Sequence, residues 1–479
     1  MMQDAPTTRA TTAEPAAAAS ALRLPEGFRF GAATAAFQIE GAVDAAGRGP
    51  SIWDTFTAVP GNVIDGTNAL VAADSYRRFA DDVALLAELG ASDYRFSIAW
   101  PRVQPSGSGP ANAAGLDYYE RLVDALAEAD IAPLPTLYHW DLPQPLEDAG
   151  GWLVRDTALR FADYVGLVLD RLGDRVGRWI TLNEPAMTTL EGYALGTQAP
   201  GRQLMLDALP TVHHQLLGHG LAVAAIRAAG SGSRSGPAEV GITNNHTLVV
   251  PASDAPADLM AAGAFDLIYN RIFAGPVLTG AYPDLSAFGL EQFPGLEEGD
   301  LELISAPLDF YGVNFYNPTY VAAPAADSEF AAAGLPFEPV APPEGTPLTG
   351  FDWPIVPSAF TELLVGLRRD YGDALPPVVI TENGASFVDE VVVASDGARA
   401  VHDAERVAYL DGHLRAVADA IEQGVDVRGY FAWSLMDNFE WAQGYTQRFG
   451  LVHVDFETGE RTPKDSFAWY RDLIAAQPR

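Results

Sequence analysis

The chain has 479 residues, and its 29 Lys and Arg against 63 Asp and Glu give a formal net charge of -34. A charge of this sign repels phosphate backbones and anionic lipid surfaces, which excludes nucleic acid as an expected partner. Hydrophobic residues make up 48% of the sequence, but no stretch approaches the roughly 20 apolar residues of a membrane span. We therefore expect a globular protein with a large core and no membrane insertion.

The N-terminal segment differs in composition from the rest of the chain. It contains Asp4, Glu14 and Pro15 and only short runs of alanine, so it lacks the basic and apolar regions of a secretory signal peptide. We predict a disordered tail at residues 1–21, one folded domain over residues 22–479, and a cytoplasmic protein. The sequence leaves open whether the chain forms a homo-oligomer.

From about residue 28 the chain alternates short apolar runs with longer amphipathic stretches, a pattern typical of strand–helix units around a parallel sheet. The expected strands are, in order, residues 28–38, 93–100, 132–140, 178–184, 239–247, 309–316, 377–382 and 429–435. Apolar residues at three- and four-residue spacing predict helices at 72–89, 115–129, 157–172, 212–229, 360–371 and 404–423.

Eight strands alternating with helices predict an α/β fold built as a single (β/α)8 TIM barrel. A doubly wound open sheet is the competing architecture. It normally has a glycine-rich phosphate loop after an early strand, and neither GxGxxG nor GxxxxGK[ST] occurs in the sequence. The longest interruptions of the pattern, residues 248–258 and 321–357, are expected to be long βα loops that act as walls or lids.

Two glutamates come at the ends of expected strands. The apolar run at residues 179–182 leads to Glu184, and the run at 378–381 leads to Glu382. In a (β/α)8 barrel the strands end at the active-site face, so two such carboxylates can face one bond, as the cleavage of an acetal requires. A strand-end glutamate taken singly more often caps a helix or forms an ion pair, and spacing alone leaves that alternative open.

The two glutamates lie in the segments TLNEP (181–185) and ITENG (380–384), which resemble the paired signatures of glycoside hydrolase family 1, the β-glucosidase family. Further segments resemble the same family along nearly the whole chain. They are FQIEG (37–41), SIWD (51–54), YRFSI (94–98), YHWDLP (138–143), GVNFY (312–316), WSLMDNFEW (433–441) and RTPK (461–464).

The resemblance implies a retaining exo-acting β-glycosidase, mainly a β-glucosidase with β-galactosidase and β-fucosidase side activity. Glu184 corresponds to the family's general acid/base and Glu382 to its nucleophile, and the charge of Glu382 is expected to raise the pKa of Glu184. Arg95 and Tyr316 correspond to the groups that keep the nucleophile ionised. Taken singly, such an Arg is most often a structural ion pair and such a Tyr a half-buried wall.

The resemblance also implies a set of sugar-binding residues. They are Gln38, His139, Trp140, Asn183, Asn314, Trp433, Glu440 and Trp441. Gln38 and Glu440 would grip the side of the ring that bears the 3-, 4- and 6-hydroxyls, and Asn183 the 2-hydroxyl. A carboxylate at Glu440 favours an unphosphorylated sugar, because the family's 6-phosphosugar branches replace it.

The leaving-group side is less well predicted. Many family members follow the acid/base motif with an aromatic residue, but here Pro185 is followed by Ala186 and Met187, which leaves the aglycone preference open. Trp353, in the second long loop, resembles the family's aglycone platform, although a loop Trp can instead pack beneath its own loop.

Metal and cofactor chemistry are not expected. The sequence has no cysteine, which excludes thiolate metal sites and cysteine nucleophiles. His213, His214 and His219 lie on an expected helix without the four-residue spacing of an HExxH site, so we interpret them as structural. The competing functions are a transglycosylase, which uses the same chemistry, and a carbohydrate-binding protein on an inactive barrel. The presence of both glutamates argues against the inactive barrel.

Overall fold

The computed structural model describes residues 22–230, 237–397 and 399–478. The tail predicted at residues 1–21 lies outside the described residues. None of the helices within the described ranges has both the length and the apolar character that crossing a membrane requires.

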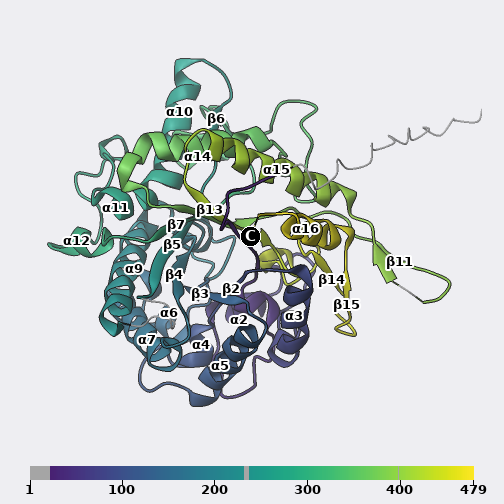
Figure 1. Ribbon diagram of the computed structural model, residues 1–479. Helices are drawn as coiled ribbons and strands as arrows, with labels where there is room; N and C mark the ends of the chain where they lie inside the picture. Colours follow the sequence, from purple (N-terminus) through teal and green to yellow (C-terminus); the bar gives the residue numbers. More distant parts are fainter. Residues whose placement is uncertain (1–21, 231–236, 398, 479) are drawn as a thin grey trace, which may run out of the picture.

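Eight parallel strands form a closed barrel, and the predicted fold class is confirmed. Figure 1 shows barrel strands at the centre of the molecule. Around the barrel the strand order is β1-β13-β10-β7-β5-β4-β3-β2. The bounds are β1 (Arg29–Ala33), β2 (Asp93–Ser97), β3 (Ala132–Tyr138), β4 (Arg178–Asn183), β5 (Glu239–Asn245), β7 (Phe310–Asn314), β10 (Val378–Asn383) and β13 (Val427–Trp433). Each strand overlaps one of the eight expected from the sequence.

The first expected strand is too long. β1 ends at Ala33, and a single helical turn, α1 (Ala36–Ile39), follows it. Every residue of this turn is buried, so the apolar run continues past the end of the strand and does not mark it. The eighth expected strand starts too late, because β13 begins at Val427, two residues before the expected start.

Helices surround the barrel in Figure 1, and the six expected ones are present within a few residues of their predicted bounds. They are α3 (Ser75–Leu89), α5 (Ala113–Glu128), α7 (Asp156–Leu172), α9 (Pro210–Ala229), α14 (Pro357–Tyr371) and α15 (Ala404–Glu422). In α3 the buried residues Val83, Leu86 and Leu89 recur every three positions, and Gly90 ends the helix in the left-handed conformation at φ 74°.

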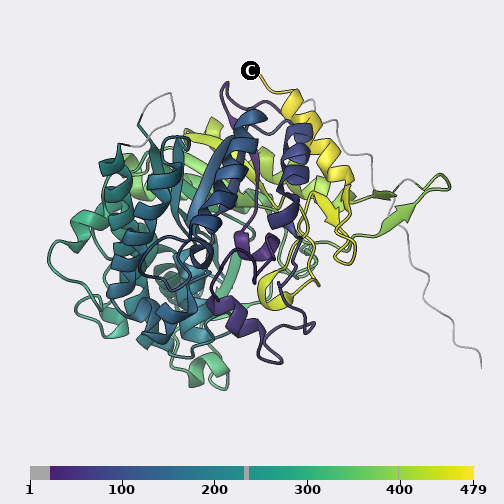
Figure 2. The ribbon, with the colours of Figure 1, turned by 90° about the horizontal axis from the view of Figure 1, so that it is seen from below.

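Further helices were not predicted, because most are short or lack a strong apolar stripe. They are α2 (Ile52–Thr57), α4 (Trp100–Val103), α6 (Gln144–Asp148), α8 (Pro185–Met187), α10 (Pro256–Asp266), α11 (Ile272–Thr279), α12 (Asp300–Ile304), α13 (Glu329–Ala332) and α16 (Asp465–Ala475). Figure 2 shows the C-terminal helix α16 lying alongside α3, where it helps to close the ring of helices.

The two long interruptions contain structure of their own. A three-stranded sheet, β6 (Val249–Pro251), β8 (Thr319–Ala322) and β9 (Glu338–Val340), joins the loop after β5 to the loop after β7. Two hairpins are also present, β11 (Val391–Val393) with β12 (Arg399–Val401), and β14 (Val452–Val454) with β15 (Arg461–Pro463). The β11–β12 hairpin stands out from the body in Figures 1 and 2.

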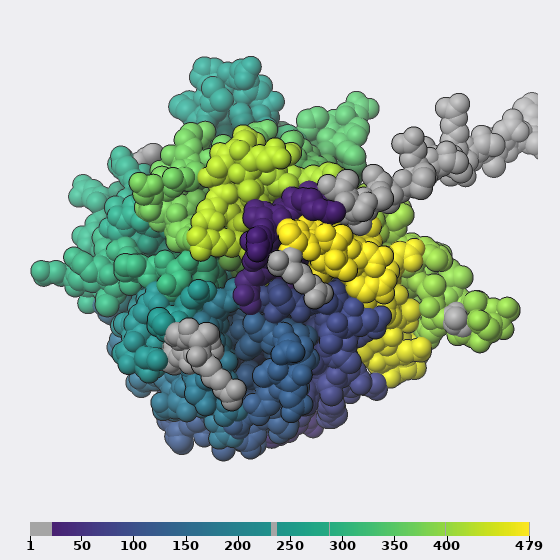
Figure 3. Space-filling view, viewed as in Figure 1, coloured from purple at the N-terminus to yellow at the C-terminus, as the bar shows by residue number. Residues whose placement is uncertain are grey.

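The two ends of the described chain lie together. The backbone N–H of Leu24 donates to Gln477 Oε1 at 3.0 Å, and Gln477 Nε2 donates to the carbonyl of Leu22 at 3.2 Å. Figure 3 shows the purple N-terminal segment against the yellow C-terminal helix. These contacts tie α16 to the first described residues of the chain.

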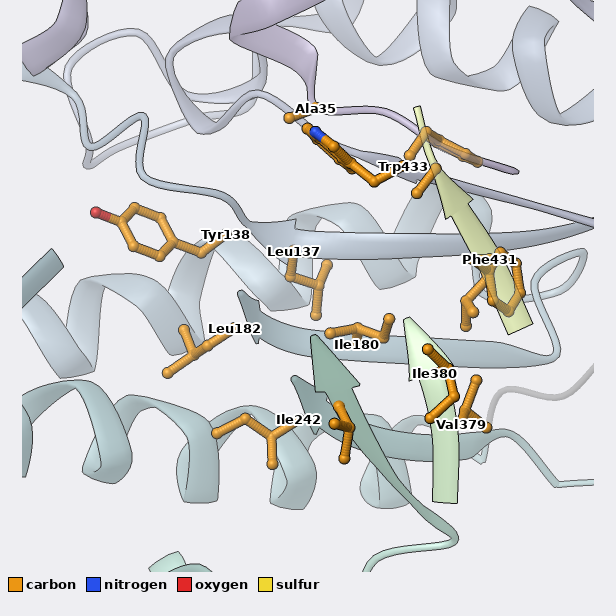
Figure 4. Packing of buried hydrophobic residues seen from close by; sticks show 14 of the residues in the cluster. Ala35, Leu137, Tyr138, Ile180, Leu182, Ile242, Val379, Ile380, Phe431 and Trp433 are labelled. Carbon is orange, nitrogen blue, oxygen red and sulfur yellow. The ribbon is translucent and has the colours of Figure 1, made fainter. Parts of the chain in front are cut away.

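The core is one continuous cluster of hydrophobic side chains. Figure 4 shows part of it, with labelled side chains from β3, β4, β5, β10 and β13. Because helices cover the barrel on the outside and side chains fill it on the inside, both faces of each strand are buried. This explains why the strands appear in the sequence as continuous apolar runs.

A buried carboxylate lies at the N-terminal face of the barrel, opposite the face that carries the cavity. Asp93, at the start of β2, has no exposed side-chain surface and accepts two hydrogen bonds from Arg29 at 2.7 Å each. It also forms an ion pair with Arg178 at the start of β4. Asp93 therefore links β1, β2 and β4 at the N-terminal face of the barrel.

We expect Asp93→Ala to lower the free energy of unfolding by about 3–5 kcal/mol, because it leaves two cations without their buried partner. Chemical denaturation measures this loss. Asp174→Ala is the control, since Asp174 pairs with Arg175 at the surface and its loss should cost less than about 1 kcal/mol. Equal losses in the two variants would contradict the role given to Asp93.

Candidate active site

A cavity of about 390 Å³ opens at the C-terminal ends of the barrel strands. Nine of the thirteen site residues expected from the sequence line it. They are His139, Trp140, Glu184, Tyr316, Trp353, Glu382, Trp433, Glu440 and Trp441. The other four, Gln38, Arg95, Asn183 and Asn314, are buried and hydrogen-bonded to the lining residues. The structure thus brings all thirteen together.

Glu382 lies in β10 and is held by two donors from other strands. Arg95, from β2, forms a buried ion pair with Glu382 Oε1 and also donates to the carbonyl of Thr381 at 3.0 Å. The Tyr316 hydroxyl donates to Glu382 Oε2 at 2.6 Å. Each carboxylate oxygen of Glu382 therefore has its own hydrogen-bond donor.

Glu184 directly follows β4, and β5 and β7 lie between its strand and that of Glu382 in the barrel. Its Oε1 accepts a hydrogen bond of 2.5 Å from Asn314 Nδ2. Its backbone N–H donates to the carbonyl of Thr243 at 2.8 Å, so the main chain is held against β5. Both glutamates are buried, at 4% and 3% relative exposure.

The environments of the two carboxylates differ. The pKa of Glu184 is raised well above its ordinary value, first by burial and then by the negative charge of Glu382, although the Asn314 hydrogen bond and Arg95 oppose the shift. The predicted effect of Glu382 is present, but burial is the larger cause. The shift favours the protonated form of Glu184, which lies across the cavity from a carboxylate that has a cation and a phenol as partners.

Asn183 connects the two sides of the cavity. Its Oδ1 accepts hydrogen bonds from Arg95 at 2.6 Å and from Asn314 at 3.1 Å, and its Nδ2 donates to His139 Nε2 at 3.0 Å. The indole N–H of Trp140 donates to its carbonyl at 3.0 Å. Burial and the charge of Arg95 lower the pKa of His139 well below its ordinary value, so His139 is neutral and can accept at Nε2.

Gln38 and Glu440 form the polar group at the other side of the cavity. Gln38 Nε2 donates to Glu440 Oε2 at 3.1 Å, to Asn438 Oδ1 at 2.9 Å and to the carbonyl of Phe439 at 3.0 Å. The Gln38 Oε1 atom is buried and has no partner within the described residues. It remains as an acceptor for a ligand hydroxyl. Burial and the charge of Glu382 raise the pKa of Glu440 to about 8.

Stacked aromatic rings line the same side. Trp441 stacks on Phe37 at 6.0 Å with an interplanar angle of 5°, and lies 4.6 Å from Trp140 and 5.8 Å from His139. Trp433 stacks on His139 at 6.0 Å. Flat apolar faces next to amide and carboxyl groups are suited to a sugar ring, which has apolar C–H faces and polar edges.

Three non-glycine residues at the cavity have a left-handed backbone. The φ angles are 72° for Trp140, 47° for Glu184 and 51° for Trp441. Such conformations cost about 1–3 kcal/mol each and persist where the surrounding structure imposes them. Gly384 meets a different constraint, because a Cβ there would lie 1.8 Å from the carbonyl oxygen of Trp433. The glycine lets the end of β10 approach the end of β13.

Trp353 lines the cavity, packs against Tyr316 at 5.4 Å and stacks on Phe351 at 4.4 Å. Several other lining residues were missed by the sequence interpretation. They are Met187, Glu191, Gln198, Asn245, His246, Thr247, Tyr269, Asn317, Thr319, Phe351, Gln443 and Phe449. Most come from loops and from the helical segments after β4 and β6, where no strand end or quoted motif marks them.

The histidines outside the site make structural contacts. His213 Nε2 lies 2.9 Å from Asp300 and its Nδ1 lies 3.0 Å from the Tyr282 hydroxyl. His219 Nδ1 lies 2.6 Å from the Thr181 hydroxyl, and His214 Nδ1 lies 2.9 Å from the carbonyl of Trp152. In residues 22–230, 237–397 and 399–478, no group of three or more His, Asp or Glu side chains is arranged to hold a metal ion.

A closed barrel with two buried glutamates at the ends of nonadjacent strands, in a cavity with aromatic and amide walls, has the arrangement of a glycoside hydrolase. The sequence profile of glycosyl hydrolase family 1 matches residues 20–478. The chain belongs to this family. The family and enzyme class predicted from the motifs, a glycoside hydrolase of the β-glucosidase family, are confirmed.

Relatives with assigned names match nearly the full chain. A bifunctional β-D-glucosidase/β-D-fucosidase from Bifidobacterium breve is 46% identical over 94% of this chain and 98% of its own length. The thermostable β-glucosidase B of Thermobispora bispora is 47% identical over 95% of this chain and 92% of its own length.

Solved structures match as well. The psychrophilic β-glucosidase of Micrococcus antarcticus has a TM-score of 0.89 and 44% identity, covering 96% of this chain and 99% of that one. A β-glucosidase from Thermotoga maritima in complex with glucoimidazole has a TM-score of 0.86 and 40% identity, covering 95% and 99%.

In a Glu382→Gln variant we expect the pKa of Glu184 to fall, because the negative charge that raises it is removed, and to stay above its ordinary value because burial remains. Carboxyl ¹³C NMR of labelled glutamate measures this pKa. Glu191→Gln is the control, since Glu191 lines the same cavity and is not among the groups that shift Glu184. An unchanged or raised Glu184 pKa in Glu382→Gln would contradict the coupling.

Proposed function

We propose that the protein is a retaining, exo-acting β-glycosidase, mainly a β-glucosidase that releases terminal non-reducing β-D-glucosyl residues. One observation carries the proposal. Glu382 is held by Arg95 and Tyr316, while Glu184, across the same cavity, has a pKa raised by burial and by the charge of Glu382. A charged carboxylate opposite a protonated one is the pair that a double displacement requires.

In the first step, Glu382 attacks the anomeric carbon and the bond from that carbon to the leaving oxygen breaks. Glu184 gives its proton to that oxygen, and the aglycone departs as a neutral alcohol. The product is a glycosyl ester on Glu382. Tyr316 and Arg95 orient the attacking carboxylate, because their donors hold each of its oxygens.

In the second step, the ester no longer carries the charge of Glu382, so the pKa of Glu184 falls and the residue can act as a base. Glu184 takes a proton from water, and the oxygen of this water attacks the anomeric carbon. The ester bond breaks and Glu382 regains its charge. Two inversions at one carbon retain its configuration.

The sugar-binding roles follow the geometry of the walls. Gln38, with an unpaired buried oxygen, and Glu440 would bind the hydroxyls on the 3-, 4- and 6-side of the ring. Asn183 and His139 would bind the hydroxyls nearest Glu184, and Asn314 would orient Glu184 itself. The rings of Trp433 and Trp441 would lie against the apolar C–H face, with Trp140 behind Trp441.

The relatives support a glycone preference of this kind. The Bifidobacterium breve relative is described as acting on β-D-glucosides and β-D-fucosides, and the Thermotoga maritima enzyme has been solved with glucoimidazole and with galacto-hydroximolactam. We therefore propose side activity on β-galactosides and β-fucosides. Trp353 is proposed as the aglycone platform, since it lines the cavity, stacks on Phe351 and is only partly buried.

Three further proposals concern the whole chain. Residues 22–479 would form one catalytic domain, since all thirteen site residues come from one barrel and its loops. The protein would work in the cytoplasm on small β-glycosides and oligosaccharides without a cofactor. A homo-oligomer stays an open prediction that size-exclusion chromatography with light scattering tests.

Replacing the proposed nucleophile tests the mechanism directly. Glu382→Ala should lower kcat on an aryl β-glucoside by on the order of 10⁴-fold or more, because the covalent step has no substitute in the cavity. Initial rates of a clean preparation measure this loss. Glu191→Ala is the control, since it removes another carboxylate from the lining and should keep kcat within about tenfold. Substantial turnover by Glu382→Ala would contradict the assignment of Glu382 as the nucleophile.

A second prediction concerns phosphorylated sugars. Among the described residues that line the cavity none is Lys or Arg, and Arg95 is already paired with Glu382. A buried phosphate would therefore lack a cation, and near neutral pH this lack matters more than repulsion from Glu440, whose pKa is about 8.

We expect kcat/KM for a 6-phospho-β-glucoside to be lower than for the matched β-glucoside by on the order of 100-fold or more. Initial rates on the two aryl substrates in one buffer measure the ratio. A preference for the phosphorylated substrate would show that the pocket assignment is wrong, although the catalytic pair could still stand.

A further inference from the structure

The RTPK segment found in the sequence ends in Lys464, a residue that the chemistry above does not use. Its side chain has no exposed surface. The ammonium group donates to Asp437 Oδ1 at 2.7 Å and forms a second ion pair with Asp389, which is equally buried. A fully buried lysine between two carboxylates is costly to desolvate and is stabilised only if its partners stay in place.

The two carboxylates have further cationic partners. Arg448 donates to Asp437 Oδ2 at 2.7 Å, and Arg406 donates to Asp389 at 3.1 and 3.0 Å. Arg406 also forms an ion pair with Asp403. The cluster, defined as Asp389, Asp403, Arg406, Asp437, Arg448 and Lys464, thus contains three cations and three carboxylates. All but Arg448 are almost completely buried.

The neighbouring cations favour the ionised form of Asp437 in this environment. Burial would raise the pKa of Asp437, but Lys464 and Arg448 outweigh it, and the pKa lies below its ordinary value. Burial and Arg406 lower the pKa of Lys464, while Asp437 and Asp389 oppose that shift. The cluster is therefore electrically balanced, so removing one member leaves a buried charge without its partner.

The cluster joins the loop that follows the strand of Glu382 to the loop that carries Glu440. Asp389 lies in the loop after β10, seven residues beyond Glu382, and Asp437 lies in the loop after β13, three residues before Glu440. Lys464, at the end of the β14–β15 hairpin, contacts both. One ammonium group thus links the strand of the proposed nucleophile to the segment that holds Glu440.

The segment after Asp437 is fastened at both of its ends. The backbone N–H of Asp437 donates to the carbonyl of Val452 at 2.9 Å, and its Oδ1 accepts from the N–H of Gly450 at 2.9 Å. At the other end, the N–H of Phe439 donates to the carbonyl of Gln38 at 3.1 Å. Because the short segment between these hydrogen bonds has little conformational freedom, a shift of Asp437 would also shift Glu440.

We propose that Lys464 is a positioning residue that sets the place of Glu440 relative to Glu382 by holding Asp437 and Asp389 together. The inference rests on the proposed function and assigns to the buried cluster a part in glycone selectivity. Lys464 does not touch the sugar. It acts through the loop that carries Glu440, on the side of the ring that bears the 6-hydroxyl group.

The test is a double-mutant cycle of Lys464→Met and Glu440→Gln, assayed with aryl β-glucoside and aryl β-xyloside, which lacks the C6 group. We expect Lys464→Met to lower kcat/KM for the glucoside by about 10- to 100-fold, since small misplacements of binding groups cost that much. The loss on the xyloside should be smaller. In the Glu440→Gln background, Lys464→Met should cost less than about threefold, because coupled residues are not additive.

Lys464→Arg is the conservative variant and should restore part of the glucoside preference, because it keeps the charge. Arg178→Met is the matched control. It removes a cation paired with buried Asp93 at the opposite face of the barrel, and should lower stability while leaving the glucoside-to-xyloside ratio unchanged. If Lys464→Met does not fold, Asp389→Asn carries the test, since it weakens the same link and keeps an acceptor oxygen.

A purely structural role predicts another pattern, namely equal losses on both substrates and an additive cycle. That result, or an unchanged ratio in Lys464→Met, would overturn the proposal. The wild-type rate on the glucoside is measured first. Its absence would contradict the proposed function, whereas wild-type turnover with an additive cycle would contradict only the positioning role.

Discussion

The buried ion pair between Arg95 and Glu382 connects strands on different sides of the barrel, from β2 to β10. Both ions are almost completely buried and lose most of their contact with water, so each depends on the other and on further hydrogen-bonding partners. Arg95 also donates to Asn183, the residue before Glu184, so the same guanidinium reaches toward both glutamates. Tyr316 completes the environment of Glu382, and the resulting negative charge then acts on Glu184 and Glu440.

The rest of the fold can be understood as support for this arrangement. The barrel places the strand ends in one ring, Asp93 links strands at the opposite face, and the aromatic rings around Trp441 form one wall of the cavity. The charged cluster around Lys464 joins the loops after β10 and β13. Glu184 and Trp441 have left-handed backbone conformations, which are costly and persist where the surrounding contacts impose them.

Much of this was predictable from the sequence. The eight apolar runs located every barrel strand because strands with two buried faces carry a continuous hydrophobic signal, and the glutamates after β4 and within β10 could be found as polar residues that end such runs. The same signal failed at β1, where the buried turn Ala36–Ile39 continues the run without being a strand.

Features that depend on long-range contacts were harder to predict from the sequence. The sequence indicated that Glu382 raises the pKa of Glu184, but the larger contribution of burial depends on side chains from several strands packing together. Asn314 stays a predicted sugar-binding residue, and nothing in the sequence indicated that its amide also donates to Glu184. The lining residues Met187 and Tyr269 come from helical segments that carry no periodic pattern, and Asn245 ends β5 outside the motifs found in the sequence. Lys464 was visible only as the end of a motif, because nothing local marks Asp389 and Asp437 as its partners.

The central claim is that Glu382 attacks the anomeric carbon while Glu184 serves as acid and then as base. The most direct measurement is ¹H NMR of the reaction of wild-type protein with an aryl β-glucoside, read before the sugar mutarotates. Two displacements at one carbon predict that the first glucose released is the β-anomer. First release of the α-anomer would mean a single displacement by water, and would contradict the roles given to both glutamates.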